Sequence, residues 1–349
     1  MANKTLSILK TLWTKRPDGQ WGISGIKGIE LVPVQNSEPD YFRFESVFQL
    51  MQENPNTNIH DTLASFGSTD FLVKQSVLPV VAWMQGDSHI RCIGTASVIS
   101  CTGLIATAGH VLLDPIERGY GVTGKGSNFK MKETLNFGVF IPTSPAYGRR
   151  GFRFFPFEKY WIWGQWQESP LIHEQDKFKL LTDVAICKIA EMPNGGAHQP
   201  LGMSTNSFVI NETAFALGYA EMDDIPIESI EGELRIPEFQ MNLYASVGNI
   251  MNVFQENHLR KDVSTPGPCF DFNARIPGKM SGAPVFGADG AVVRGIVSRS
   301  FSNERHSFGA MLGPAMHLPL DDAKTIGRTL ETLMKNGNEG ISLAMGQGL

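Results

Sequence analysis

From about residue 76 onward, short hydrophobic runs rich in Val, Ile, Phe and Thr are separated by Gly, Asn, Asp and Pro. This spacing is typical of antiparallel all-β folds, in which brief strands are joined by tight turns. The runs that we interpret as strands are VLPVVAWM, GTASVIS, GLIATAG, DVAICKIA, FVINETAFALGYA, FQMNLYASVGNIMNVF, APVFG and VVRGIVSRS.

Two other segments have apolar residues at roughly helical spacing. Residues 39–54 form the first, which predicts a packing helix within an extension that covers residues 1–75. Residues 320–335 form the second, which begins with acidic residues and ends at Lys-Asn-Gly, as a final helix would. The apolar positions are Tyr41, Phe42, Phe44, Val47, Phe48 and Met51 in the first segment, and Ile326, Leu330 and Leu333 in the second.

Composition restricts the class of protein. With 349 residues, of which 42% are hydrophobic and 19% charged, the chain can bury a large core, as a soluble globular protein does. The net charge of -5 and the lack of a Lys/Arg-rich run argue against nucleic acid as a partner. No segment approaches the roughly 18 unbroken apolar residues of a membrane helix, so we expect no membrane association.

The cysteines and the N-terminus indicate the compartment. Cys92, Cys101, Cys187 and Cys269 are few for this length, and no pair has the spacing of a zinc site. The N-terminal segment lacks a secretory cleavage site. We therefore expect free thiols, a cytoplasmic location, no metal and no cofactor.

Three residues stand at predicted strand ends or turns. His110 follows the second strand of SVISCTGLIATAGH, which turns at residues 101–103, and Asp183 precedes the apolar strand VAICKIA. Ser281 lies in the turn-rich segment IPGKMSGAPVF. Each residue alone has a simpler explanation, because surface histidines, turn aspartates and glycine-flanked serines are common.

Together and in this order, the three segments resemble the trypsin/chymotrypsin-like serine peptidase family. TAGH resembles its Thr-Ala-Ala-His, DVAICKI its Asp-Ile-Ala-Leu strand, SGAPVF its Ser-Gly-Gly-Pro-Val and GIVSRS its Gly-Ile-Val-Ser-Trp-Gly. The resemblance implies two six-stranded antiparallel β-barrels. We expect residues 76–195 to form the first barrel, residues 196–320 the second, and residues 321–349 the C-terminal helix and tail.

The resemblance also implies roles for these residues. His110 would be the general base, Asp183 the carboxylate that orients it, with Asp176 in reserve, and Ser281 the nucleophile. The backbone N–H groups of Lys279 and Ser281 would bind the oxyanion.

The same resemblance assigns the specificity pocket. Arg275 would lie at its floor, and Ser298, Arg299 and Ser300 would form its wall. A guanidinium at the floor predicts cleavage after Glu or Asp, since it pairs with carboxylates. The alternative is that Arg275 faces solvent or pairs with Asp271.

Two positions depart from the family pattern. Lys279 replaces a glycine, and Met280 replaces the acid or amide that precedes the serine. If the loop requires a positive φ at Lys279, strain of about 1–3 kcal/mol results. The loss of the acid also argues against activation by a freed N-terminus.

Two further segments suggest other chemistry. GYGVTGKGS (119–127) nearly matches a phosphate-binding loop, but Gly126 replaces the Ser or Thr that would hold magnesium, which favours a surface loop. The aromatic segment 149–167 could stack nucleic-acid bases, but strands or a long loop packed on the first barrel explain it better. His173 has no identifiable partner there.

The sequence thus predicts a serine endopeptidase that acts on protein or peptide substrates, with the extension available to a regulatory partner. The alternative is a catalytically inactive module of the same fold that binds peptides by strand addition.

Overall fold

The structure is a computed structural model, and it describes the second half of the chain more fully than the first. Besides short strands within residues 1–53, it describes residues 76–100, 102–117, 121–123, 129–142, 152–167, 177–189, 200–220, 222, 225–226, 228–230, 233–235, 241–255, 263, 265–287, 292–301, 306–320 and 327–335.

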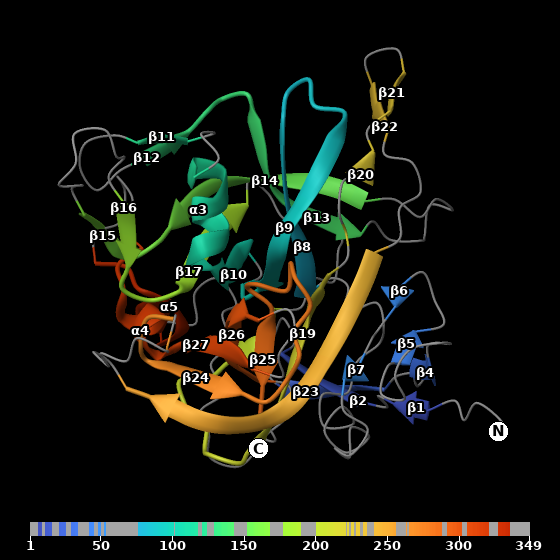
Figure 1. The fold of residues 1–349 in the computed structure, drawn as a ribbon, viewed down its shortest axis with the longest axis vertical. Coiled ribbons are helices and arrows are strands. Elements are labelled where there is room, and N and C mark those ends of the chain that lie inside the picture. The colour runs from blue at the N-terminus through green and yellow to red at the C-terminus, as the bar shows by residue number, and fades with distance from the viewer. Residues whose placement is uncertain are drawn as a thin grey trace.

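Six strands form a first closed antiparallel barrel (Figure 1). Their order around the barrel is β10-β17-β14-β13-β8-β9, and pairing of Ile105 with Val98 joins β10 back to β9. The strands are β8 (Val77–Met84), β9 (His89–Val98), β10 (Leu104–Ala108), β13 (Leu135–Pro142), β14 (Phe152–Trp161) and β17 (Val184–Ile189).

Six later strands form a second closed antiparallel barrel. Their order is β26-β25-β19-β23-β24-β27, and β27 pairs with β26 to close it. The strands are β19 (Thr213–Tyr219), β23 (Met241–Phe254), β24 (Cys269–Phe272), β25 (Pro284–Phe286), β26 (Val292–Ser300) and β27 (Ser307–Met311).

Shorter strands attach to the barrels or form pairs of their own. β18 (Gly202–Met203) runs parallel to β26, and β20 (Ile225–Pro226) pairs with β9. The two-stranded pairs are β11 (Gly121–Thr123) with β12 (Phe129–Met131), β15 (Gly164–Gln167) with β16 (Lys177–Leu180), and β21 (Glu228–Ile230) with β22 (Glu233–Arg235).

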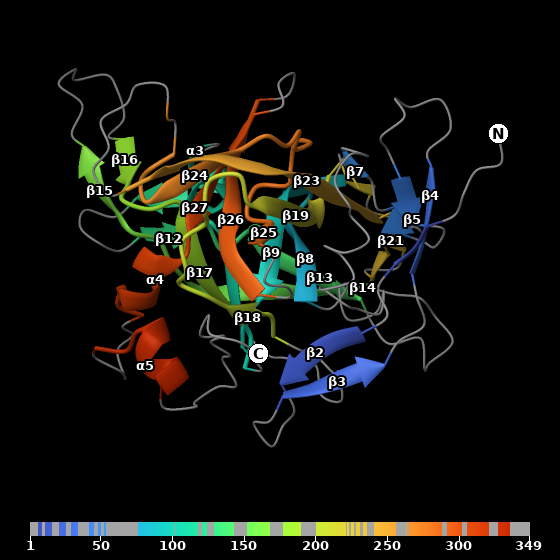
Figure 2. The same ribbon diagram turned by 90° about the horizontal axis from the view of Figure 1, so that it is seen from below.

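The predicted helix over residues 39–54 is wrong, because β5 (Phe42–Phe44), β6 (Phe48–Gln49) and β7 (Gln52–Glu53) lie in this segment. Both β6 and β7 run parallel to β23, and β7 lies near β23 in Figure 2. Aromatic residues are common in strands, and here pairing with neighbouring strands determines the local structure. The earlier strands are β1 (Leu6–Ile8), β2 (Thr11–Lys15), β3 (Trp21–Gly25) and β4 (Ile29–Pro33).

Three helices are described: α3 (Gly109–Glu117), α4 (Gly313–His317) and α5 (Leu330–Lys335). The predicted C-terminal helix is shorter than residues 320–335. Gly327, with a φ of 77°, and a bridge between Pro319 and Thr329 precede α5, so the helix begins only at Leu330. Leu330 and Leu333 are buried as predicted, and Ile326 lies outside the described residues.

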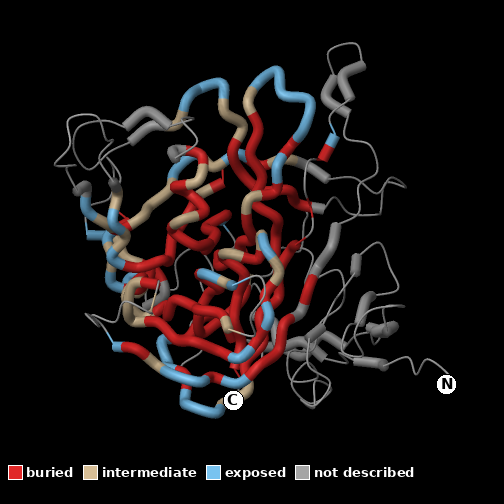
Figure 3. Tube along the Cα trace, viewed as in Figure 1, coloured by how far each residue is buried: buried red, intermediate tan, exposed pale blue. Residues whose placement is uncertain are grey.

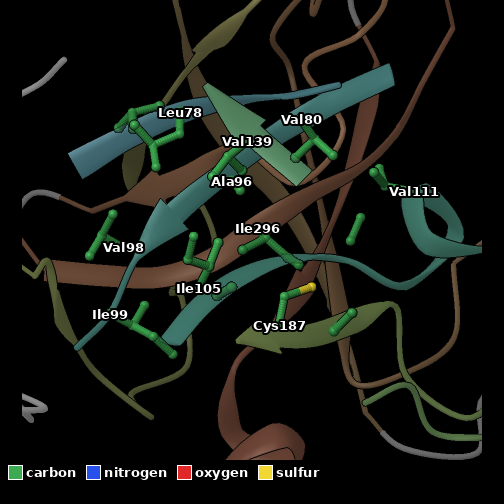
Figure 4. Close-up of a cluster of buried hydrophobic side chains, with 14 of the residues drawn as sticks. Leu78, Val80, Ala96, Val98, Ile99, Ile105, Val111, Val139, Cys187 and Ile296 are labelled. Carbon is green, nitrogen blue, oxygen red and sulfur yellow. The ribbon is translucent and has the colours of Figure 1, made fainter. Parts of the chain in front are cut away.

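The largest hydrophobic cluster contains residues of both barrels. Ile296 of β26 lies among first-barrel side chains such as Ile105 and Val139 (Figure 4). Buried segments run through both barrels, and exposed residues concentrate in the connections (Figure 3). Because the barrels share this core, residues at the strand ends on either side of their junction are held in fixed relation.

The chain therefore has the fold of the trypsin/chymotrypsin-like serine peptidases, as the sequence predicted. Among the described residues, no helix is long and apolar enough to cross a membrane.

Candidate active site

Strand pairing brings the predicted base and its carboxylate together. In the antiparallel pair of β10 and β17, Ala108 lies opposite Val184, so the residues just beyond these strand ends are neighbours. The N–H of Gly109 donates to the carbonyl oxygen of Asp183 at 3.1 Å, which extends the pairing by one more bond. His110 follows in the first turn of α3 and thus faces Asp183.

Both oxygens of Asp183 bind His110. Oδ1 accepts the backbone N–H of His110 at 2.9 Å, and Oδ2 lies 2.8 Å from the ring Nδ1. An ionised carboxylate only accepts hydrogen bonds, so Nδ1 must carry the proton. When the ring is neutral, the other ring nitrogen, Nε2, then has the lone pair that a general base requires.

Asp183 is only 1% exposed, yet its surroundings keep it ionised. Burial by itself would raise the pKa of Asp183. The charge of His110 and the hydrogen bonds from His110 and Ser298 outweigh burial, and the pKa lies below its ordinary value of 3.8. The carboxylate therefore remains charged at neutral pH.

The loop that carries Ser281 is fixed to both barrels. The carbonyl oxygen of Ser281 accepts the N–H of Thr95 of β9 at 2.8 Å. The N–H of Gly282 donates to the carbonyl of Val297 of β26 at 2.8 Å, and the N–H of Ala283 closes a turn onto Met280 at 2.9 Å. The serine thus lies at the junction of the barrels.

Two glycines show how closely the Ser281 and His110 segments pack. A Cβ added to Gly94 would lie 2.8 Å from the side chain of Val111 and 2.9 Å from the carbonyl oxygen of Ser281. Gly282 has a φ of 87°, and an added Cβ would lie 2.9 Å from the backbone nitrogen of Ala108. Gly94 thus lies close to both Ser281 and Val111, the neighbour of His110, and Gly282 lies close to Ala108.

The hydroxyl of Ser281 donates to the carbonyl oxygen of Ser298 at 3.2 Å. In this rotamer its proton does not reach His110. The backbone N–H of Ser281 finds no acceptor among the described residues, which leaves it available to an oxyanion.

The two departures from the family pattern have structural consequences. Lys279 has a φ of 76°, so the loop does adopt a positive φ at this position. Met280 is fully buried in the core of the second barrel with Ala283 and Ile276. Apolar packing thus anchors the position before the serine, where the family has an acid or amide.

The residues predicted for the specificity pocket differ in burial and in their contacts. Ser298 is fully buried, and its hydroxyl donates to Oδ2 of Asp183, so this side chain supports the carboxylate instead of facing substrate. Arg299 and Arg275 are exposed, and Ser300 is half-buried. Asp271 binds Asn252 and His306, each at 3.1 Å. Asp176 and His173 lie outside the described residues.

Sequence reasoning missed Thr95, whose side chain is fully buried. Its Oγ1 accepts the N–H of Tyr219 of β19 at 2.9 Å and lies 3.4 Å from the carbonyl oxygen of Lys279. Thr95 therefore connects a strand of each barrel to the serine loop. A threonine in a β-rich run gives no sign of this role.

The described residues contain no group of His, Cys, Asp and Glu side chains that could hold a metal ion. Among the described residues, Cys92, Cys187 and Cys269 are buried and form no disulfide. Burial raises the pKa of Cys187, and burial together with the charge of Asp271 raises the pKa of Cys269 to about 12. Thiols with such pKa values are poor nucleophiles.

No protein-family model and no curated protein sequence match this chain. Solved structures do. Deg5 is 16% identical, with a TM-score of 0.41, and the match covers 70% of this chain and 86% of Deg5. The Rv3671c protease from M. tuberculosis, in its active form, is 17% identical with a TM-score of 0.38, over 69% of this chain and 78% of that one.

A third similar structure is the scabies mite inactivated protease paralogue S-I1. It is 12% identical with a TM-score of 0.42, and the match covers 70% of this chain and 92% of that one. At such values the assignment of the fold rests on the strand pairing of the two barrels.

Proposed function

We propose that this protein is a serine endopeptidase that hydrolyses peptide bonds of protein substrates through an acyl-enzyme. The observation that carries the proposal is the pair formed by His110 and Asp183, in which one hydrogen bond holds the backbone of His110 and a second holds its ring at Nδ1, so that Nε2 can act as the base. Ser281 lies on a loop whose next residue, Gly282, closely approaches Ala108, two residues before His110.

In the proposed reaction, the hydroxyl of Ser281 first turns from the carbonyl of Ser298 toward Nε2 of His110. The turn exchanges one hydrogen bond for another, so it costs no more than the bond that is lost, about 0.5–1.5 kcal/mol. Ser281 then attacks the substrate carbonyl as His110 accepts its proton, and Asp183 stabilises the imidazolium.

The remaining steps use the same residues. The backbone N–H of Ser281, and with it that of Lys279, would donate to the oxyanion of the tetrahedral intermediate. The imidazolium of His110 returns its proton to the leaving amine, and water, activated by the same base, hydrolyses the acyl-enzyme. No metal or other cofactor takes part in this chemistry, and we propose that the enzyme works with reduced thiols in the cytoplasm.

A second candidate function is a peptide-binding module that has lost catalysis. The observation that favours it is the hydrogen bond from Ser281 to Ser298, which directs the nucleophile away from the base. If that rotamer persists with substrate bound, the protein would hold a peptide without cutting it.

A fluorophosphonate probe separates the two functions, because only an activated serine reacts rapidly with it. The peptidase proposal expects rapid labelling of the wild type, none of Ser281→Ala and strongly slowed labelling of His110→Ala. Casein digestion should follow the same order and be unaffected by EDTA or dithiothreitol. A wild type that labels no faster than Ser281→Ala, although folded, would refute the peptidase and leave the peptide-binding module as the candidate.

A further inference from the structure

Thr265 extends the hydrogen-bonded group at Asp183 into the second barrel. Its Oγ1 lies 2.9 Å from the hydroxyl oxygen of Ser298, and that hydroxyl in turn binds Oδ2 of Asp183. Thr265 is 2% exposed, and Ser298 is fully buried. No water competes for these hydroxyls at such burial, so their partners are fixed by the protein.

The direction of each hydrogen bond follows from the donors available. Ser298 has one hydroxyl proton, and the carboxylate of Asp183 only accepts, so this proton must point to Asp183. The oxygen of Ser298 is then an acceptor for Thr265, which must be the donor. Thr265, Ser298, Asp183 and His110 therefore form one chain in which every proton has a single acceptor.

We propose that Thr265 is a positioning residue for the reaction, acting through Ser298 on Asp183. The inference rests on the proposed peptidase function, because it assigns a role within the same site. By donating to Ser298, Thr265 keeps the serine proton on the carboxylate and strengthens that bond, since hydrogen bonds in a chain polarise one another. Asp183 is then held in the orientation that positions the His110 ring.

The position of Thr265 in the fold gives this role a structural basis. The residue lies four positions before Cys269, the first residue of β24, and its carbonyl accepts the Cys269 thiol at 3.5 Å. Asp183 and His110 adjoin strands β17 and β10 of the first barrel, whereas Thr265 precedes β24 and Ser298 lies in β26 of the second. The chain of hydrogen bonds thus makes the geometry of the base depend on correct docking of the two barrels.

The test compares Thr265→Val, which removes the hydroxyl, with Thr265→Ser, which retains it. We expect Thr265→Val to lower kcat by about 3- to 10-fold, the rate equivalent of one buried hydrogen bond, with KM unchanged. Thr265→Ser should stay within about twofold of the wild type, because it restores the donor. Equal losses in both variants would show that the methyl group matters, and would overturn the proposal.

A second measurement does not depend on proteolysis. The proton on Nδ1 of His110 should give a low-field NMR signal in protein labelled with 15N-histidine, because it is hydrogen bonded to a carboxylate. Thr265→Val should move this signal or speed its exchange with water, whereas Thr265→Ser should leave it in place. A signal that is unchanged in Thr265→Val would refute the role of Thr265.

Ser307→Ala is the matched control for the NMR measurement. The Ser307 hydroxyl is also fully buried and makes one bond, to the carbonyl of Ala274 at 2.8 Å, but it does not touch Asp183. Its loss should lower stability and leave the His110 signal unchanged. If the peptidase proposal is wrong, the wild-type protein will neither hydrolyse casein nor react with the fluorophosphonate. The NMR comparison would still decide whether Thr265 orients Asp183.

Discussion

Replacement of Lys279 by glycine should stabilise the protein, although glycine usually destabilises. Lys279 has a φ of 76°, in the left-handed region that side chains with a Cβ avoid. That conformation costs about 1–2 kcal/mol for an ordinary residue. Glycine removes this cost but adds about 0.5–1 kcal/mol of backbone entropy lost on folding. The difference is a gain of up to about 1.5 kcal/mol in the free energy of unfolding.

Urea denaturation measures this gain, provided that the wild type and variants unfold with the same m-value. Lys279→Ala separates the backbone effect from that of the lysine side chain, because alanine keeps the Cβ and hence the strain. The free energy of unfolding of Lys279→Gly should therefore exceed that of Lys279→Ala by the net gain worked out above, up to about 1.5 kcal/mol. If Lys279→Gly is less stable than Lys279→Ala, the left-handed conformation of this loop is refuted.

Asn211 provides a control for the conformation itself. Its φ is 69°, but it lies in an exposed turn, and asparagine tolerates the left-handed region better than lysine does. Asn211→Gly should change stability by less than about 0.5 kcal/mol. The N–H at position 279 survives in Lys279→Gly, so fluorophosphonate labelling should be as fast as in the wild type or faster.

Three further predictions concern the same site. Because the pKa of Asp183 is lowered on folding, its contribution to stability is complete above the unfolded value of 3.8 and disappears as pH falls through the folded pKa. The difference in free energy of unfolding between the wild type and Asp183→Asn should thus shrink below pH ~4, by about 1.4 kcal/mol for each unit by which folding lowers the pKa of Asp183. A difference that stays constant with pH would contradict this prediction. Gly282→Ala should lower the free energy of unfolding by about 2–5 kcal/mol in urea melts, since φ is 87° and the new Cβ would lie 2.1 Å from the carbonyl oxygen of Thr95. The control is Gly278→Ala, which should be nearly neutral because a Cβ there would meet nothing within 4 Å. Arg275 is exposed, so Arg275→Ala should weaken any preference for cleavage after Glu or Asp by no more than about fivefold in a peptide-library digest. Complete loss of that preference would show that Arg275 reaches the substrate.

The strands and their ends could be predicted because they depend on local patterns, whereas the two barrels were predicted from the family resemblance. The run VLPVVAWM coincides with β8, and the turn predicted at 101–103 falls between β9 and β10. His110 was placed correctly just beyond the end of β10 for the same reason. The prediction of a helix over residues 39–54 was wrong, because the spacing of its aromatic residues fits both a helix and a strand. Pairing with β23 determines which of the two forms.

The role of Ser298 shows what a local pattern leaves undetermined. Alternation of polar and apolar residues reveals which face of a strand is buried only if the other face meets water. In β26 the residues from Val292 to Ser298 are all buried, because one face packs into the second barrel and the other meets the first. The direction of the Ser298 hydroxyl therefore depends on how the barrels dock. Resemblance placed this residue near the substrate, but the contact between the barrels directs its proton to Asp183 and its carbonyl oxygen to Ser281. One buried residue thus binds both the carboxylate and the nucleophile of the proposed site, so the site can form only when the two barrels are correctly joined.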